Sequence, residues 1–313
     1  MTDADEIRAY WKYADAEEDD LLAFMGDRQS ELADSLQNVL DHFRSTALFD
    51  NLNRLEVNRL HRKLSQWQRA GTDAGEFNLV ARDLSNRTRI SGNEALLAYI
   101  WIEFIGFDDD VMERDEEMLL NVSRNAYDRE FQRAQQMTGA GKANPPTAKD
   151  VDKWFDGTTP DGGNYKDDIY ADARYRAGQF QKMVNAEKQQ MNASTPLGPK
   201  KALDIDNRQY QKALKAQKDW MLRRSQYGAN KDNHAGRLDM YMSYVIGETV
   251  TRAFQNSNVK KFQFIATIDD RTTEACRSRH LKIFPMKNAM IGVNIPPIYP
   301  PYHPCRSIIR AVE

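Results

Sequence analysis

Apolar residues recur at helical spacing along the first part of the chain. Between Asp3 and about Arg44 they follow steps of three and four residues once Gln29 is included, at Met25, Leu32, Leu36, Val39 and Phe43. This spacing places the side chains on one face of an α-helix, so it predicts a long helix here, and a second helix is expected from Leu52 to Ala70. The stripe fits a face packed in the protein core, and a groove for a partner is the alternative.

The most apolar run of the sequence extends from Ala95 to Phe107. Ser91 and Glu94 precede it as a capping box, in which each side chain satisfies the other residue's backbone amide at the start of a helix. The run contains Glu103 and is shorter than the roughly 20 apolar residues that span a bilayer. It therefore predicts a buried helix, and a long polar helix is expected from about Asp109 to Met137.

Glycine and proline interrupt the middle of the chain. The stretch from Thr138 to Asp150 holds two glycines and a Pro-Pro pair, which end a first helical region at residues 1–140. Residues 141–200 are expected to form an irregular linker that carries one helix, from about Asp167 to Met191.

Residues 201–257 are expected to form a second helical region, with helices at about Asn207–Tyr227 and Ala235–Asn256. The first of these carries basic residues interleaved with Tyr210 and Trp220, a pattern that can follow a phosphate backbone. An ordinary solvated helix is the alternative. The candidate nucleic-acid contacts are Lys212, Lys215, Lys218, Arg223 and Arg224.

The hydrophobic period changes from helical to alternating after Asn258. Phe262, Phe264, Ala266 and Ile268 are apolar and alternate with other residues. This alternation is typical of a strand with two distinct faces. A second strand is expected at Ser307–Val312, where it can pair with the first, and a short helix near Thr272 lies between them. Residues 258–313 thus predict a small α+β unit. The fold class expected for the chain is mainly α, with elongated helical N-terminal and middle regions.

Charge is distributed unevenly. The charged fraction of 29% and the mean hydropathy of −0.74 favour long solvated helices. The net charge of −2 gives no global attraction to nucleic acid, but residues 1–60 carry 14 acidic and 6 basic side chains, whereas residues 258–313 carry 9 basic and 4 acidic ones. The two ends are therefore expected to face different partners, with plain solvated faces as the alternative. The acidic N-terminus has no apolar signal region, so export by that route is not expected.

Both cysteines and two of the five histidines fall near the C-terminus, at Cys276, His280, His303 and Cys305. The first two are four residues apart and share a helix face, and the last two share a side of an extended chain. Two thiolates and two imidazoles can close a tetrahedral zinc site, which would be structural because no position stays open for water. Zinc would also stabilise a unit too small for a sufficient core. The alternative is that the cysteines are small core residues and the histidines line a surface loop.

Two segments of this unit carry a family resemblance: IDDRTTEACRSRHLKIFP (Ile268–Pro285) and PPIYPPYHPCRS (Pro296–Ser307). They resemble the C-terminal signature of the phage minor head proteins, also called head morphogenesis proteins, a family that includes the F protein of phage Mu. The chain departs from that signature at Leu281, where many members have glycine, at Ser307, which replaces a second cysteine, and by one residue missing before Cys305. The matching residues are Asp269, Arg271, Thr272, Cys276, Phe284, Pro300, Pro301, His303, Cys305 and Arg306.

The resemblance implies a low-copy virion protein of a tailed phage, in the capsid interior or at the portal vertex after assembly in the host cytoplasm. Such a protein associates with the portal protein during procapsid assembly and acts in DNA packaging or ejection, without catalysis. Other expected partners are the major capsid or scaffolding protein and double-stranded DNA bound without sequence specificity. Within the unit, Arg306 is expected to pair with the turn at Asp269, Asp270 and Arg271, so that the terminal loop acts as a clasp.

Two other classes of function remain open. A zinc-dependent hydrolase or toxin-like enzyme would use the same His/Cys cluster, with Asp269, Asp270 or Glu274 as a general base. The sequence shows no His-Glu-x-x-His helix and no Gly-x-Ser-x-Gly elbow, which weighs against it. A membrane-active ejection protein would use Ala95–Phe107, but that run is short and its flanks are acidic, so no membrane partner is expected.

Overall fold

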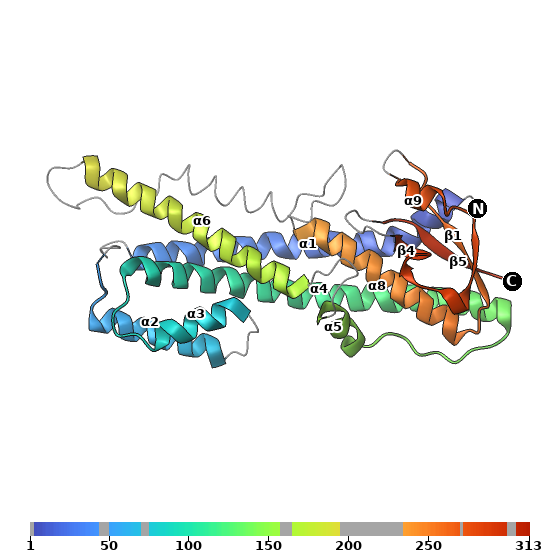
Figure 1. The fold of residues 1–313 in the computed structure, drawn as a ribbon, viewed down its shortest axis with the longest axis horizontal. Coiled ribbons are helices and arrows are strands. Elements are labelled where there is room, and N and C mark those ends of the chain that lie inside the picture. The colour runs from blue at the N-terminus through green and yellow to red at the C-terminus, as the bar shows by residue number, and fades with distance from the viewer. Residues whose placement is uncertain are drawn as a thin grey trace. The chain divides into compact units, whose positions relative to one another are not determined.

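The computed structural model describes residues 3–43, 50–69, 75–156, 165–194, 234–269, 272–298 and 305–313. They are mainly helical, and a small sheet region is formed by the C-terminal residues (Figure 1). The chain divides into two compact units built from separate stretches. Unit 1 takes Met1–Ala23, Glu113–Tyr165 and Trp220–Glu313, and unit 2 takes Phe24–Met112 and Lys166–Asp219.

The helices agree with the hydrophobic pattern except at three places. Their bounds are α1 Asp3–His42, α2 Arg54–Arg69, α3 Gly75–Ser85, α4 Gly92–Thr138, α5 Ala148–Asp156, α6 Tyr165–Ser194, α8 His234–Asn256 and α9 Glu274–Arg277. The two helices expected on either side of Asp108 are one continuous helix, α4, because no proline separates them and Gly106 fits inside a helix. Helices α3 and α5 were not predicted. The helix expected at Asn207–Tyr227 lies outside the described residues.

Unit 2 holds the predicted capping box and an aromatic core. The Ser91 amide donates to Glu94 Oε2 at 2.9 Å and the Glu94 amide donates to Ser91 Oγ at 3.2 Å, which confirms the start of α4. Phe77 on α3 lies edge-on to Trp67 and Trp101, with ring centroids 5.6 and 5.0 Å apart. Such aromatic packing buries part of the apolar run of α4. Separately, no helix among the described residues is long and apolar enough to cross a membrane.

Unit 1 contains the sheet region. Strand β1 (Lys261–Ile265) lies between β2 (Ile283–Pro285) and β5 (Ile308–Val312) and is antiparallel to both, which confirms the predicted pairing of the two terminal strands. A second, parallel pair is formed by β3 (Ile291–Gly292) and β4 (Ile295–Ile298), preceded by a 3₁₀ turn at Met286–Asn288. Strands β2, β3 and β4, which lie between α9 and β5 along the chain, were not predicted.

Helix α8 supports this region by a close backbone approach (Figure 1). A Cβ atom at Gly247 would stand 2.3 Å from the carbonyl oxygen of Pro296 on β4, so only glycine allows the helix to lie this close. Phe262 and Phe264 of β1 are fully buried, as the alternating pattern predicts for one face of the strand. Helix α8 thereby holds the strands in place. Along the chain, α9 with Cys276 lies after β1, and Cys305 lies before β5.

Candidate functional site at the C-terminal clasp

The structure brings two of the four predicted zinc ligands together. Cys276 lies on α9, whose first turn is capped by the side chain of Thr273, and Cys305 lies just before β5. Their Sγ atoms are 4.0 Å apart and both residues are buried. Two thiolates on one tetrahedral zinc ion lie about 3.8 Å apart, given Zn–S bonds of about 2.3 Å. The spacing of the cysteine pair therefore suits two adjacent metal ligands as well as two neighbouring thiols.

The histidines are placed less favourably for a metal. His280 Nδ1 accepts a hydrogen bond from the Ala266 amide at 3.2 Å, which leaves the ring proton on Nε2 and engages one of the two nitrogens. His303 lies outside the described residues. No group of three or more histidine, cysteine or acidic side chains gathers at metal-binding distance in the described ranges. The donors that the described chain offers at this point are the two thiols.

The surroundings of Cys305 favour the protonated form of its thiol when no metal is bound. The pKa of Cys305 is raised well above its ordinary value, first by the hydrogen bond with Cys276 and then by burial. A thiolate is a better nucleophile than a thiol, so a raised pKa makes a catalytic cysteine unsuited to this position.

The acidic turn before α9 is held by local hydrogen bonds. Thr272 Oγ1 accepts from the Asp269 amide at 2.8 Å and donates to Asp269 Oδ1 at 2.9 Å. Arg277 donates to the carbonyl oxygens of Thr272, at 3.0 Å from Nε, and of Asp269. Asp270 and Arg271 lie outside the described residues, so pairing of Arg306 with Asp270 stays a prediction.

The described contacts of Arg306 join it to the N-terminal helix. Its carbonyl oxygen accepts a hydrogen bond of 2.9 Å from Trp11 Nε1, and its guanidinium lies 4.7 Å from the centre of the Trp11 ring. Its Nη1 is 2.5 Å from Asp15 Oδ1. We call Trp11, Asp15 and Arg306 the terminal clasp, because together they fasten the start of β5 to α1.

A row of ion pairs continues from the terminal clasp through unit 1. Arg310 on β5 reaches Glu6 on α1 at 2.9 Å. Glu6 lies 3.6 Å from Arg133 on α4, and Arg133 lies 3.3 Å from Glu130. The acidic N-terminal and basic C-terminal ends were expected to face different partners. In the structure, some of these acidic and basic side chains form ion pairs with each other. That charge asymmetry was the sequence signal from which this contact could have been inferred.

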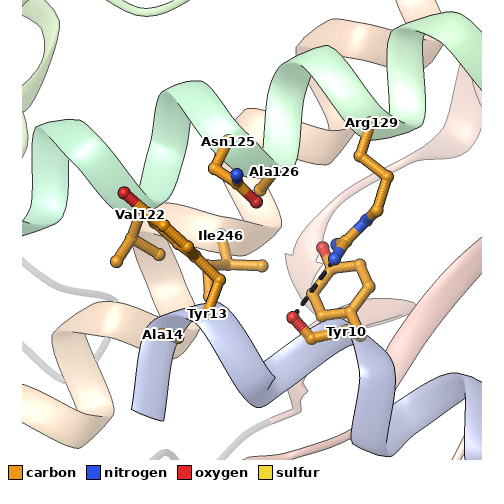
Figure 2. A pocket seen from close by; sticks show the side chains of 8 residues that line it. All are labelled: Tyr10, Tyr13, Ala14, Val122, Asn125, Ala126, Arg129 and Ile246. Carbon is orange, nitrogen blue, oxygen red and sulfur yellow. Dashed lines mark hydrogen bonds between the residues drawn. The ribbon is translucent and has the colours of Figure 1, made fainter. Parts of the chain in front are cut away.

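Glu130 is the buried end of this row. Its carboxylate accepts from Arg129 Nε at 2.9 Å, but burial outweighs the two arginines and raises the pKa of Glu130 above its ordinary value. Arg129 also donates to the Tyr10 carbonyl oxygen at 3.2 Å, and its guanidinium lies 3.9 Å from the centre of the Tyr10 ring (Figure 2). Burial raises the pKa of Tyr10 as well. These contacts fix α1 against α4.

A small pocket lies beside these contacts, between the first turns of α1 and helices α4 and α8 (Figure 2). Its free volume is about 10 Å³, which is room for about one water molecule. An organic substrate does not fit in this volume. The pocket is lined by Tyr10, Tyr13, Ala14, Val122, Asn125, Ala126, Arg129 and Ile246.

The candidate nucleic-acid contacts lie outside the described residues, and so do two prolines of the family signature. These residues are Lys212, Lys215, Lys218, Arg223 and Arg224, with Pro300 and Pro301. Comparisons with protein-family models, with curated proteins and with solved structures found no match. The resemblance to the phage minor head proteins therefore rests on the C-terminal residues themselves.

Proposed function

We propose that this protein is a minor capsid, or head morphogenesis, protein of a tailed phage. It associates with the portal protein, acts in procapsid assembly and in DNA packaging or ejection, and contacts DNA without reading its sequence. The observation that carries the proposal is the C-terminal signature, whose two halves each supply one cysteine of the pair with Sγ atoms 4.0 Å apart. The two halves of the signature thus meet at one place in the fold, as is expected of a structural module.

The backbone at Leu281 gives independent support. Many members of the resembling family have glycine at this position, and Leu281 has φ of 62°. This is the left-handed region, which glycine adopts readily and leucine only with strain. The glycine of the family pattern thus has a physical reason at this place in the fold, where the chain turns from α9 into β2.

A structural zinc ion is part of the proposal. Cys276 and Cys305 would supply two thiolates, with His303 and a reoriented His280 as the remaining ligands, and the ion would replace some of the core that a small unit lacks. The test is metal content measured on the purified chain and on Cys305→Ser. One equivalent of zinc in the first and none in the second supports the ion, and no zinc in a chain purified without chelator removes it from the proposal.

The long helices would supply contact surfaces for the portal protein and for the major capsid or scaffolding protein. Buried polar contacts in each unit, such as the ion pair of Arg176 with Asp108, hold the helices in a defined arrangement. The described pocket has room for about one water molecule, and the pKa of Cys305 is raised by its hydrogen bond with Cys276 and by burial. In the proposal the chain acts in assembly, without catalysis.

The experiment that tests the proposal is co-expression with a portal protein, if one is encoded beside this chain, followed by co-purification and measurement of stoichiometry. A stable complex is the expected result, and Leu79→Ser, at an exposed apolar position on α3, provides a surface variant for comparison. No complex, together with absence of the protein from purified virions, would overturn the proposal. A zinc-dependent enzyme built on the His/Cys cluster would then be the next function to test.

A further inference from the structure

Helix α2 in unit 2 presents arginines on its solvent face. Its sequence RLEVNRLHRKLSQWQR contains five basic residues and one acidic residue. Val57, Leu60 and Leu64 are buried and mark the inner face. The opposite side exposes three arginines within nine residues, or about 12 Å along the helix axis, and we call Arg54, Arg59 and Arg62 the arginine face.

The arginine face has no counter-ions in the part of the chain that the structure describes, whereas several other cations of unit 2 are paired. Lys63, on the same helix, lies 2.7 Å from Glu103, and Arg87 lies 2.8 Å from Glu94. Arg28 and Arg176 pair with aspartates. Arg54, Arg59 and Arg62 thus share one exposed side of α2 without an ion pair to any described carboxylate.

The one acid of α2 is engaged at the start of the helix. Glu56 Oε2 accepts from the Asn53 amide at 2.9 Å, and Asn53 Oδ1 accepts from the amides of Leu55 and Glu56 at 2.9 and 3.0 Å. This is a reciprocal N-terminal cap, which keeps the carboxylate at the helix end. Glu56 is therefore engaged with the backbone and forms no ion pair with Arg54, Arg59 or Arg62 in the described structure.

We propose that the arginine face of α2 binds the phosphate backbone of double-stranded DNA without reading its sequence. The guanidinium group suits this role because its planar fork can donate two hydrogen bonds to one phosphate. Neutral polar residues, Asn58 and Gln66, accompany the arginines on the exposed side of the helix. The inference rests on the DNA contact of the proposed function and places it on a described helix, separate from residues 207–227.

A lipid surface fits this helix less well than DNA. A helix that lies on a membrane inserts a broad apolar face, but α2 buries its own apolar face, and it packs against α3. Leu55 is the exposed large apolar residue on its described part, 57% exposed. A charged surface without a free apolar face favours a hydrophilic polyanion.

The salt dependence of binding gives a quantitative expectation. Each phosphate neutralised contributes about −0.9 to the slope of log K against log salt, so three arginines contribute about −2.7. Between 50 and 200 mM salt this contribution alone weakens binding by about 40-fold. Loss of the arginine face should therefore lower affinity most at low salt and make the slope shallower by about 2.7.

The experiment measures fluorescence anisotropy of labelled duplexes of two unrelated sequences, titrated with the full chain over that salt range. The test variant carries Arg54→Gln, Arg59→Gln and Arg62→Gln. The control variant carries Lys142→Gln, Lys149→Gln and Lys153→Gln, which remove the same charge at exposed positions of unit 1. Circular dichroism checks that both variants remain folded, as expected for exposed side chains.

A shallower slope in the arginine variant, with the control close to the parent on both duplexes, supports the inference. Equal losses in the two variants, or no loss in either, overturn it. Binding to phosphatidylserine vesicles that depends on the arginine face while duplex binding does not would overturn it in favour of a membrane. Portal co-purification of the arginine variant separates the two proposals, because a retained complex with unchanged DNA binding leaves the proposed function standing and removes only this inference.

Discussion

Replacement of Trp11 by phenylalanine tests whether the terminal clasp stabilises the C-terminal strand. Trp11 is 4% exposed, and its indole N–H donates to the Arg306 carbonyl oxygen at 2.9 Å. Phenylalanine keeps an aromatic ring in the same place but cannot donate this bond. The carbonyl oxygen of Arg306 then loses this hydrogen bond, and the guanidinium of Arg306 lies over a ring with a weaker π system.

The expected loss is about 2 kcal/mol in the stability of unit 1. Removal of the donor to a partly buried acceptor costs about 1–2 kcal/mol, between the net value of an ordinary hydrogen bond and the penalty of a fully buried unsatisfied acceptor. The weaker cation–π contact adds about 0.5 kcal/mol. Because tenfold corresponds to about 1.4 kcal/mol, hydrogen-exchange protection of β5 amides that exchange by opening of this unit should fall by about 30-fold.

Trp101→Phe is the matched control. Trp101 is 2% exposed and also lies near an arginine, Arg174, at 5.7 Å from the ring centre. Its Nε1 is buried and has no hydrogen-bond partner in the described structure, so the same substitution removes ring volume without removing a hydrogen bond. Hydrogen exchange followed by mass spectrometry should show a loss around Trp101 that is smaller by about 1–2 kcal/mol. Equal losses at the two tryptophans would refute the assignment of the stabilisation to the hydrogen bond.

Three further changes have expected outcomes. Leu281→Gly should raise stability by about 1 kcal/mol in urea denaturation, because it removes left-handed strain at an exposed position, and a loss would show that the strain estimate is wrong. Gly247→Ala should lower the free energy of unfolding, measured in thermal melts, by several kcal/mol, because its Cβ would stand 2.3 Å from a backbone oxygen of β4. Gly178→Ala is the control: its Cβ would have no atom within 4 Å, so the melts should show no change or a slight gain in stability. Asp150→Asn should cost about 1–2 kcal/mol at neutral pH, because Arg252 at 2.9 Å lowers the pKa of Asp150. That contribution is present above the unfolded pKa of about 4 and disappears as pH falls through the lower folded value, so denaturation curves of variant and parent should converge in acid, and a constant difference would contradict this account.

Local signals in the sequence were sufficient where a segment is long or has a distinctive cap. The 3.6-residue period predicted α1 and α2, and the Ser91–Glu94 box predicted the start of α4. Helix α5 was missed although Thr147 and Asp150 form a similar reciprocal cap, with hydrogen bonds of 2.8 and 3.3 Å. The preceding Pro-Pro pair directed attention to a break and away from the helix that begins after it.

Short strands gave too little pattern to be recognised. Strands β2, β3 and β4 have three, two and four residues, so no alternation can be counted. Segment Ile295–Ile298 contains two prolines, which favour an edge or a loop, yet all four residues are buried. Their assignment to strands depends on tertiary partners: β2 pairs with β1, whereas β3 and β4 pair with each other and lie against α8.

Local patterns were enough to predict the helical class, the break after Thr138 and the alternating strand at Phe262, because each depends on residues within a few positions of one another. The fold brings Arg306 to Asp15, 291 residues away along the chain. It also leaves Arg54, Arg59 and Arg62 without a counter-ion among the described residues, whereas Lys63 on the same helix is paired. A charged side chain has many possible partners of opposite sign in this sequence. Which one it meets is fixed by the packing of distant apolar faces, and no local pattern contains that information.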